Sequence, residues 1–515
     1  MPSQTTKQRI LVVASDNFRR DWAVRMHLMG CADVYLLTLK KMDRLDIIAD
    51  NDISAARVWS LAELYTEQAI LFKRRGTKAA TEDIRNWEQK GCTSFGQLLS
   101  YNMSRNMVPG MREDDYVSRI WSEYNIMNQL LETIRPDVCL GELSRSYYVV
   151  LHDVAAVRQI PFLSPIDYDA FFFPQPTMFM FDINGRIIGL EDRYHSYVND
   201  EGSPTEEAAE FPAGIEKHVL QRSTFTPPNL STTKSLFRKL AYRVTHLKNW
   251  LNSQKIDRRF FYDSLEFGNG ISAIYKRFFI RKIRYWATCN LSALRWKGLN
   301  KRPSGEKYIY FPLHFYPEVV SSVFANKFIH HFQQEQHLIQ WLAKSLPAGY
   351  KLYVKEHKNM MHNRSWQFYS EVASIPNVRL FHANAHGFDL LDHANLIVTI
   401  NSTTGLEGII RRRPVLTFHG VYYRGLAQVK TVDLNMDLNI QLQDALATQL
   451  DESARATALA ALYDSGCPIQ FEPCDYIPDY SYRLNDQGVG DLAFMIANIS
   501  NKWHQSRSAL ATGER

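Results

Sequence analysis

The stretch from Leu396 to Gly408 constrains the fold more than any other part of the chain. Leu396 to Ile400 is a continuous apolar run typical of a buried strand, and a small, hydroxyl-rich turn leads from it into a helical pattern. At such a junction the backbone N–H groups, the helix dipole and short Ser and Thr side chains converge on one point, which suits a phosphate. The stretch therefore favours a nucleotide-binding enzyme.

The second half of the chain repeats this pattern of strand and helix. Apolar runs predict five strands, at 308–311, 351–354, 378–381, 396–400 and 414–418. Helical patterns separate them, at 328–346, 364–373, 387–393 and 404–412. Five strands joined by four crossovers predict a parallel sheet whose loops at the carboxyl ends of the strands face one crevice.

The first half of the chain also alternates between predicted strands and helices. Strands are predicted at 9–14, 34–37, 136–140 and 160–163, with a helix over 145–158, which is typical of a doubly wound α/β domain. The dipeptide Asn184-Gly185 lies between apolar runs and predicts a β-hairpin excursion near 177–189.

Composition limits the class of protein. At 515 residues the chain is too long for a single core, and a hydrophobic content of 45% excludes a disordered protein. The six cysteines show no paired spacing and are expected to be reduced thiols. No window approaches the roughly 18 apolar residues of a membrane span. We therefore expect a cytoplasmic protein, with any contact to the inner membrane peripheral.

Residues 234–302 differ from the rest in charge. They hold seventeen Lys and Arg against three Asp and Glu, interleaved with aromatic residues. The simplest interpretation is a solvated helical connector, and the alternative is attraction to an anionic membrane surface. Nucleic acid is not expected as a partner, because no recognition motif accompanies the charge.

Together these patterns predict an α/β protein of two Rossmann-like lobes facing a central cleft, with a basic helical insertion between them. This is the outline of the GT-B architecture, although other two-lobed α/β enzymes share it. The expected boundaries are an N-terminal acceptor lobe over 1–230, the connector over 231–303, a nucleotide-sugar-binding lobe over 304–485 and a C-terminal helix over 486–515.

Reactive side chains gather after the strands of the second half. Lys355 and His357 follow the second of these strands and can meet a phosphodiester as cation and hydrogen-bond donor. The turn after the fourth strand can cradle the same phosphate, through Ser402, Thr403, Thr404 and Gly405. Glu407, one turn into the next helix, can accept hydrogen bonds from ribose hydroxyls.

Three further residues complete the expected site. His314 and Glu318, after the first strand of this half, can hold a sugar carboxylate or hydroxyl or pair with each other. Tyr423, next to Tyr422, offers a stacking face for a base or a sugar.

At these residues the chain resembles the capsule polysaccharide biosynthesis family, whose characterised members include bacterial Kdo transferases of GT-B fold. The resemblance extends over about 308–423. It depends on the segments Leu313 to Glu318, Val354 to His357, Thr403 to Glu407 and Arg413 to Gly420. One departure is that Lys358 follows His357 where related transferases often have proline.

The resemblance implies a glycosyltransferase that moves Kdo, or a related acidic 2-keto sugar, from a CMP-activated donor to a glycan or glycolipid of a capsule or lipopolysaccharide. It also implies that no metal and no other cofactor are required, in agreement with the lack of an Asp-x-Asp pair in the second half. The alternatives are a CDP-polyol phosphotransferase, a UDP-sugar transferase or epimerase, and a non-catalytic scaffold of a capsule assembly complex.

A transferase that deprotonates an acceptor hydroxyl needs a base opposite the nucleotide. Glu142, directly after the predicted strand 136–140, is the first candidate, and Asp16, after the strand 9–14, is the second. His314 is the catalytic candidate from the other lobe.

Overall fold

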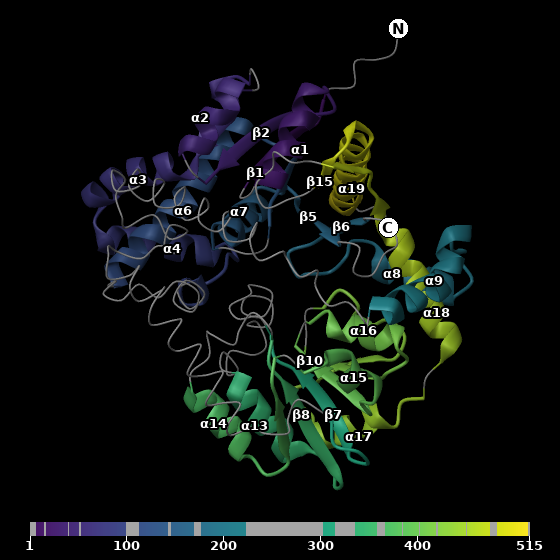
Figure 1. Cartoon of the computed structure of the whole chain (residues 1–515). Helices are drawn as coiled ribbons and strands as arrows, with labels where there is room; N and C mark the ends of the chain where they lie inside the picture. The colour runs from purple at the N-terminus through teal and green to yellow at the C-terminus, as the bar shows by residue number, and fades with distance from the viewer. Residues whose placement is uncertain are drawn as a thin grey trace, which may run out of the picture. The chain divides into compact units, whose positions relative to one another are not determined.

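The computed structural model divides the chain into two compact units (Figure 1). The structure describes residues 7–14, 17–39, 41–50, 53–98, 113–142, 146–168, 177–222, 302–314, 335–357, 366–383, 385–400, 402–418, 421–449, 451–473 and 482–512. The expected basic insertion lies outside these residues, apart from Arg302 and Pro303. In the described part, no helix is both long and apolar enough to cross a membrane.

The first unit is built on a seven-stranded sheet in the order β13-β6-β5-β4-β1-β2-β3. Its strands are β1 (Arg9–Ala14), β2 (Asp33–Thr38), β3 (Val58–Ser60), β4 (Val138–Leu140), β5 (Phe162–Tyr168), β6 (Thr177–Phe181) and β13 (Cys467–Pro468). The pairs from β3 to β5 are parallel, so that Ile10 lies between Val34 and Val138. The chain first builds outward from β1 through β2 and β3, and then returns to add β4 on the other side. This is a doubly wound, Rossmann-like sheet with its switch point between β1 and β4.

Helices connect the parallel strands of this unit. They are α1 (Asn17–Leu28), α2 (Lys41–Asp50), α3 (Leu61–Arg75), α4 (Thr77–Gln89), α6 (Glu113–Ile134) and α7 (Ser146–Val157). Continuous apolar strands such as β1, which is buried from Ile10 to Ala14, are typical of a sheet covered on both faces.

An antiparallel strand occurs near 177–189, but with partners other than those of the expected hairpin. β6 pairs antiparallel with β5, where Phe179 lies opposite Ile166, and with β13, where Met178 lies opposite Cys467. The Asn184-Gly185 turn, with Gly185 at φ 72°, leads instead toward a helix, α8 (Leu190–Val198). The structure has a turn at these residues, but turn chemistry does not specify which strand pairs with which.

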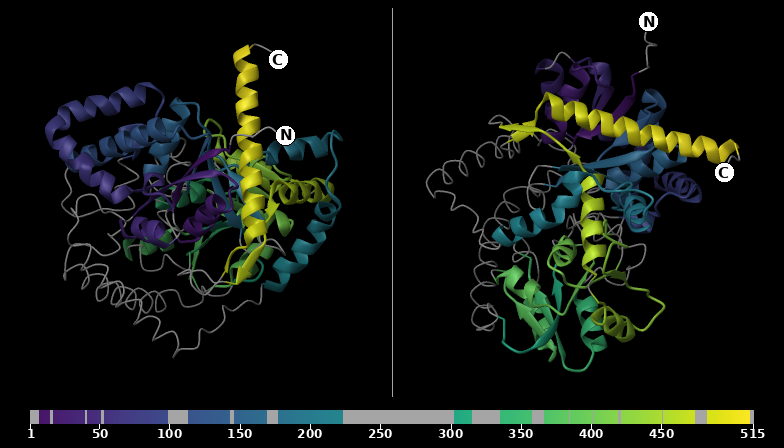
Figure 2. Two further views of the ribbon diagram at one scale, coloured as in Figure 1. Left: turned by 90° about the horizontal axis from the view of Figure 1, so that it is seen from above. Right: turned by 90° about the vertical axis from the view of Figure 1, so that its right-hand side faces the viewer.

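The C-terminal segment belongs to the first unit. It contains β13, the small antiparallel pair β14 (Phe471–Pro473) and β15 (Tyr482–Leu484), and the helix α19 (Asp486–Thr512). The ring of Phe18 in α1 stacks on that of Phe471 with 6.1 Å between centroids. The far end of α19 extends past the other elements of this unit (Figure 2), in agreement with the exposure of most residues from 501 to 507. The expected boundary at 485 therefore differs from the observed one, because Gly466 to Arg515 groups with the first unit.

The second unit is built on a six-stranded, wholly parallel sheet in the order β12-β11-β10-β7-β8-β9. Its strands are β7 (Lys307–Pro312), β8 (Tyr350–Lys355), β9 (Val378–Phe381), β10 (Leu396–Thr399), β11 (Val415–Thr417) and β12 (Val429–Thr431). β8 and β9 extend the sheet on one side of β7, and β10 to β12 on the other. The prediction of two Rossmann-like sheets is thus confirmed, whereas the central cleft stays a prediction.

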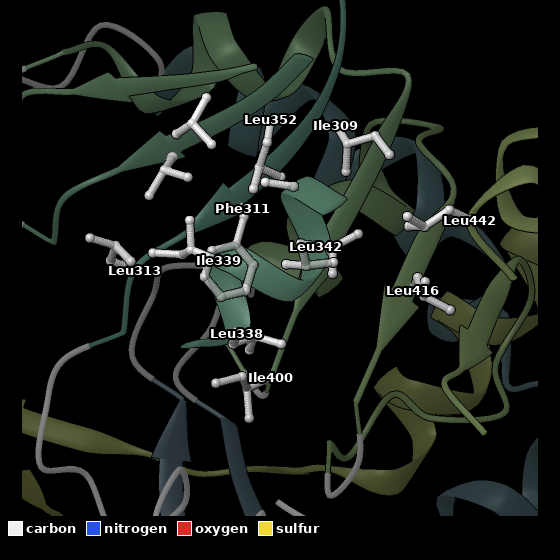
Figure 3. Packing of buried hydrophobic residues seen from close by; sticks show 14 of the residues in the cluster. Ile309, Phe311, Leu313, Leu338, Ile339, Leu342, Leu352, Ile400, Leu416 and Leu442 are labelled. Atoms are coloured by element: carbon white, nitrogen blue, oxygen red, sulfur yellow. The ribbon is translucent and has the colours of Figure 1, made fainter. Parts of the chain in front are cut away.

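Helices of the second unit bury one continuous core against this sheet. They are α13 (Glu335–Ser345), α14 (Trp366–Ser374) and α17 (Leu438–Leu446), and the unit also contains α15 (Gly387–Asp392), α16 (Thr404–Ile410) and α18 (Glu452–Ser465). Figure 3 shows Phe311 of β7 among the aliphatic side chains of α13, including Ile339 and Leu342, all three fully buried. This packing holds the carboxyl ends of β7 and β10 in fixed positions.

Residues 184–227 also group with the second unit, although the sequence led us to expect them in the first. Asp464, near the end of α18, explains this. Its carboxylate accepts hydrogen bonds from the hydroxyls of Tyr197 (2.7 Å) and Thr205 (2.6 Å), which ties α8 and the start of α9 (Glu206–Arg222) to α18. Contacts between residues some 260 positions apart leave no local signal in the sequence.

Candidate functional site

The strand order places the candidate site of the second unit at its switch point. Ligands of open α/β sheets bind outside the carboxyl ends of the strands, where the strand order reverses. In this sheet the reversal lies between β7 and β10. His314 follows β7 and Ser402 follows β10, so the topology brings together two of the expected segments, with Lys355 at the end of β8 next to them.

His314 lies under this edge rather than on its surface. Its side chain is 3% exposed, Nδ1 lies 3.1 Å from Oε1 of Glu335, and Nε2 lies 3.2 Å from Oγ1 of Thr399. The backbone N–H of His314 donates to the same Glu335 oxygen over 2.7 Å. A proton on Nδ1 fits this arrangement, since Nδ1 then donates to Glu335 and Nε2 can accept from the Thr399 hydroxyl.

The same network continues into the turn after β10. Oγ1 of Thr399 accepts the backbone N–H of Ser402 at 3.0 Å, and Oγ of Ser402 accepts that of Thr404 at 3.2 Å. His314 thus holds the turn from beneath. This differs from the expected direct contact with a sugar: the structure gives His314 a positioning role. Its expected partner Glu318 lies outside the described residues.

The turn itself presents Thr403 to solvent, with Ser402 and Thr404 half-buried. Gly405 is required behind it, because a Cβ there would lie 2.2 Å from the hydroxyl oxygen of Tyr423. That hydroxyl donates to the carbonyl of Ser402 over 2.5 Å. Tyr423 is fully buried, so the expected stacking face is absent: its ring supports the turn instead of meeting a ligand.

Lys355 and His357 follow β8 on either side of a buried carboxylate. Nζ of Lys355 lies 3.2 Å from the carbonyl of Ala383, at the end of β9. Glu356 is 2% exposed and accepts the backbone N–H of His357 and the hydroxyl of Tyr369, both at 2.6 Å. Glu356 therefore fixes the backbone that carries the two expected phosphate ligands.

Glu407 is an acid of this edge with a raised pKa. Burial raises the pKa of its carboxyl from 4.5 to about 7, although Arg411 and Lys355 act in the opposite direction. Among the residues that the structure describes, the carboxyl makes no hydrogen bond and no short ion pair. A partly buried carboxyl without a hydrogen-bonding partner, close to a lysine, is suited to a polar ligand.

Burial of Glu407 has a measurable consequence for stability. Since its pKa in the folded protein lies above 4.5, its ionisation opposes folding increasingly as pH rises from about 4.5 to 7, and fully above that. We expect Glu407→Gln to raise Tm at pH 8 and to leave it nearly unchanged at pH 5, measured by calorimetry.

Glu452 provides the control for this prediction. Its hydrogen bond to Arg455 lowers the pKa of its carboxyl, so its charge favours folding at neutral pH. Glu452→Gln should therefore lower Tm at pH 8. If both variants change Tm at pH 8 by the same amount in the same direction, burial of the Glu407 charge does not destabilise the fold as predicted.

Sequence reasoning missed the residues that support the site. Glu335, Glu356 and Thr399 orient the expected ligands from positions of 6%, 2% and 0% exposure. His382, at the end of β9, was also missed; burial and the neighbouring Lys355 lower its pKa. For Glu356, Thr399 and His382 the available signal was a polar residue within or directly after an apolar strand, since such a residue needs a partner inside the fold. Glu335 begins a helix and carries no such signal.

In the first unit, the switch point carries the other candidates. Glu142 is the second residue after β4 and lies 3.6 Å from Nη1 of Arg19 in α1, with its side chain 37% exposed. Strand β4 pairs in parallel with β1, so Glu142 follows the sheet edge at which β1 also ends. The second candidate, Asp16, lies outside the described residues.

Comparison with known proteins gives a family match for part of the chain. Residues 242–457 match the family described as capsule polysaccharide biosynthesis protein. This range contains the whole of the site described in the second unit. Among curated proteins, none matches the chain in sequence.

Solved structures resemble the chain only distantly. The beta Kdo 2,4 transferase KpsC of Thermosulfurimonas dismutans is 12% identical, with 63% of this chain and 79% of that one covered and a TM-score of 0.34. The UDP-GlcNAc 2-epimerase of Neisseria meningitidis is also 12% identical, with coverages of 96% and 100% and a TM-score of 0.29. At such values neither likeness identifies an activity.

Proposed function

We propose that this chain, whose residues 242–457 match the capsule polysaccharide biosynthesis family, is a glycosyltransferase using a nucleotide-activated sugar. The observation that carries the proposal is the convergence of Lys355, the turn at Ser402 to Thr404 and Glu407 at the switch point of the second sheet. A cation, a hydroxyl-rich turn and a carboxyl are the groups that a nucleotide requires for its phosphate and its ribose.

Each group has a defined task in this proposal. Lys355 and His357 bind the phosphate oxygens, and the turn adds hydroxyls and the backbone N–H of Thr403. Glu407 in its ionised form accepts hydrogen bonds from the ribose diol. As the glycosidic bond to phosphate breaks, negative charge develops on the leaving nucleotide, and Lys355 stabilises it without a metal ion.

Glu142 is the proposed base. It removes the proton from an acceptor hydroxyl, whose oxygen then forms a bond to the anomeric carbon while the bond from that carbon to phosphate breaks. Asp16 is the second candidate for this step. The proposed acceptor is a glycan or glycolipid of the capsule or of lipopolysaccharide.

The proposed donor is CMP-linked Kdo or a related acidic 2-keto sugar. The support is the set of sequence segments shared with Kdo transferases, which include Lys355, His357 and the turn at Thr403. A CDP-polyol phosphotransferase, a UDP-sugar transferase and a non-catalytic scaffold remain the outcomes that experiments must separate from this one.

Thermal shift with nucleotides tests the donor site. Ligand at 100 times its Kd stabilises a fold by about 2.7 kcal/mol, which should raise the Tm of a chain this long by a few degrees. We expect CMP to give this rise in the presence of EDTA, and UDP and CDP to give less. A response to UDP alone would count against the CMP donor, and loss of the CMP response in EDTA would count against a metal-free site.

A matched pair of variants shows whether the response comes from this site. Lys355→Met removes the proposed phosphate cation, whereas Lys344→Met removes an exposed cation from the last turn of α13. The CMP response should disappear in the first variant and persist in the second. If the CMP response persists in both variants, the nucleotide does not bind through Lys355 at the end of β8.

A further inference from the structure

A buried carboxylate joins three helices of the first unit. Glu123 of α6 is 0% exposed, and its Oε1 accepts from the hydroxyl of Tyr65 (2.8 Å), Nε of Arg119 (2.9 Å) and the hydroxyl of Ser146 (3.0 Å). Tyr65 belongs to α3, and Ser146 is the first residue of α7. Within the described structure, Oε2 of the same carboxylate is buried without a hydrogen-bond partner.

Stability alone does not explain this cluster. A buried ion pair is often no more stabilising than apolar residues of equal volume, and a buried oxygen without a partner is a cost. Glu123 is also out of reach of any ligand, because none of its surface is exposed. What the cluster does provide is a fixed geometry for the elements that meet there.

Ser146 links the cluster to the proposed base. Glu142 stands four residues before it, between the end of β4 and the start of α7. Gly141, next to Glu142, packs so closely on α7 that a Cβ would lie 2.6 Å from Cδ1 of Tyr148. The hydrogen bond of Ser146 holds the first turn of α7, and the contact of Tyr148 with Gly141 carries this support to the residue before Glu142.

We propose that Glu123 and Ser146 are positioning residues that hold Glu142 at the carboxyl edge of the first sheet, acting through the first turn of α7 and its contact with Gly141. This inference rests on the proposed function, in which Glu142 takes the proton from the acceptor. A base must lie within hydrogen-bond reach of that proton, and a displacement of about 1 Å can cost on the order of 100-fold in rate. Neither Glu123 nor Ser146 contacts the substrate.

Tyr65 supplies a matched control. Tyr65→Phe and Ser146→Ala each remove one hydroxyl donor to the same oxygen, so both should lower Tm by similar amounts. Only the second loosens the first turn of α7, which packs on Gly141 next to Glu142. We expect Ser146→Ala to lower kcat about 10- to 100-fold, with the donor KM within twofold of wild type. Tyr65→Phe should stay within about twofold of wild type in both constants.

Hydrogen exchange provides a readout that does not depend on turnover. Amide exchange of the peptide covering 141–148 should become faster in Ser146→Ala and stay at the wild-type rate in Tyr65→Phe. Equal exchange and equal kcat in the two variants would overturn the positioning role.

Failure of the proposed function would give a different result. Turnover is followed as CMP release from CMP-Kdo with capsular oligosaccharide of the source bacterium as acceptor. If Glu142→Gln keeps full activity in this assay, Glu142 is not the base, and the positioning role of Glu123 and Ser146 is also wrong. If Glu142→Gln is inactive and Ser146→Ala matches Tyr65→Phe, only the positioning role is wrong.

Discussion

Glu142→Gln is expected to reduce kcat by about 10²- to 10⁴-fold, the range contributed by a positioned general base. Gln keeps the size of the side chain but cannot take up the acceptor proton. Because Glu142 belongs to the first unit and the proposed nucleotide site to the second, the Tm rise with CMP should persist in this variant. Steady-state kinetics of CMP release measure the effect, with Glu67→Gln, an exposed carboxylate of α3, as the control.

Two outcomes would contradict the assignment of Glu142 as the catalytic base. If Glu142→Gln is active and Asp16→Asn is not, the base is Asp16, the second residue after β1 in the sequence. If a chain with both His357→Ala and Glu142→Gln still supports capsule synthesis in the cell, the protein acts there as a scaffold and not as an enzyme.

The fold could be predicted where strands are buried on both faces. Such strands are continuous apolar runs, and the strands observed at β7, β8, β9 and β10 lie within one residue of the expected ones. β3 and β12 were not predicted, since each has only three residues and lies at the edge of its sheet. Short edge strands take their conformation from a neighbour, and local sequence carries little of that information.

Unit membership could not be predicted at all from local pattern. Residues 184–227 join the second unit through Asp464, and residues 466–515 join the first through β13 and α19. Both assignments depend on contacts between segments hundreds of residues apart. A linear division of the sequence at composition changes cannot represent a chain that crosses between units more than once.

The positions of the candidate site residues in the sheet were predictable, whereas the surroundings of their side chains were less so. Parallel topology alone was enough to bring His314, Lys355 and Ser402 to one edge. The direction of each side chain was not: a histidine or tyrosine beyond a strand end suits a ligand site and a packed interior equally well. His314 is held in the interior by Glu335, which lies 21 residues later in the sequence. Tyr423 is held in the interior by its close packing on Gly405.

Gly405→Ala separates the effect of side-chain packing from that of helix propensity, because the two predict changes of opposite sign in the free energy of unfolding. Gly405 lies in the first turn of α16, and alanine is favoured over glycine inside a helix by about 1 kcal/mol. The added Cβ, however, would lie 2.2 Å from the Tyr423 hydroxyl oxygen and 2.5 Å from Cζ. Tyr423 is fully buried and bonded to Ser402, so it has no room to withdraw. We expect a net loss of about 1–3 kcal/mol in the free energy of unfolding.

Denaturant unfolding measures this change, and Gly490→Ala is the control. Gly490 lies in α19 with nothing within 4 Å of an added Cβ, so alanine there should stabilise the chain by about 0.5–1 kcal/mol. Because Ser402 and Thr404 form the proposed phosphate turn, displacement of Tyr423 should also weaken the CMP response in Gly405→Ala and leave it intact in Gly490→Ala. A stabilised Gly405→Ala chain would mean that α16 does not pack on Tyr423, and the turn would then lose the support on which the donor site depends.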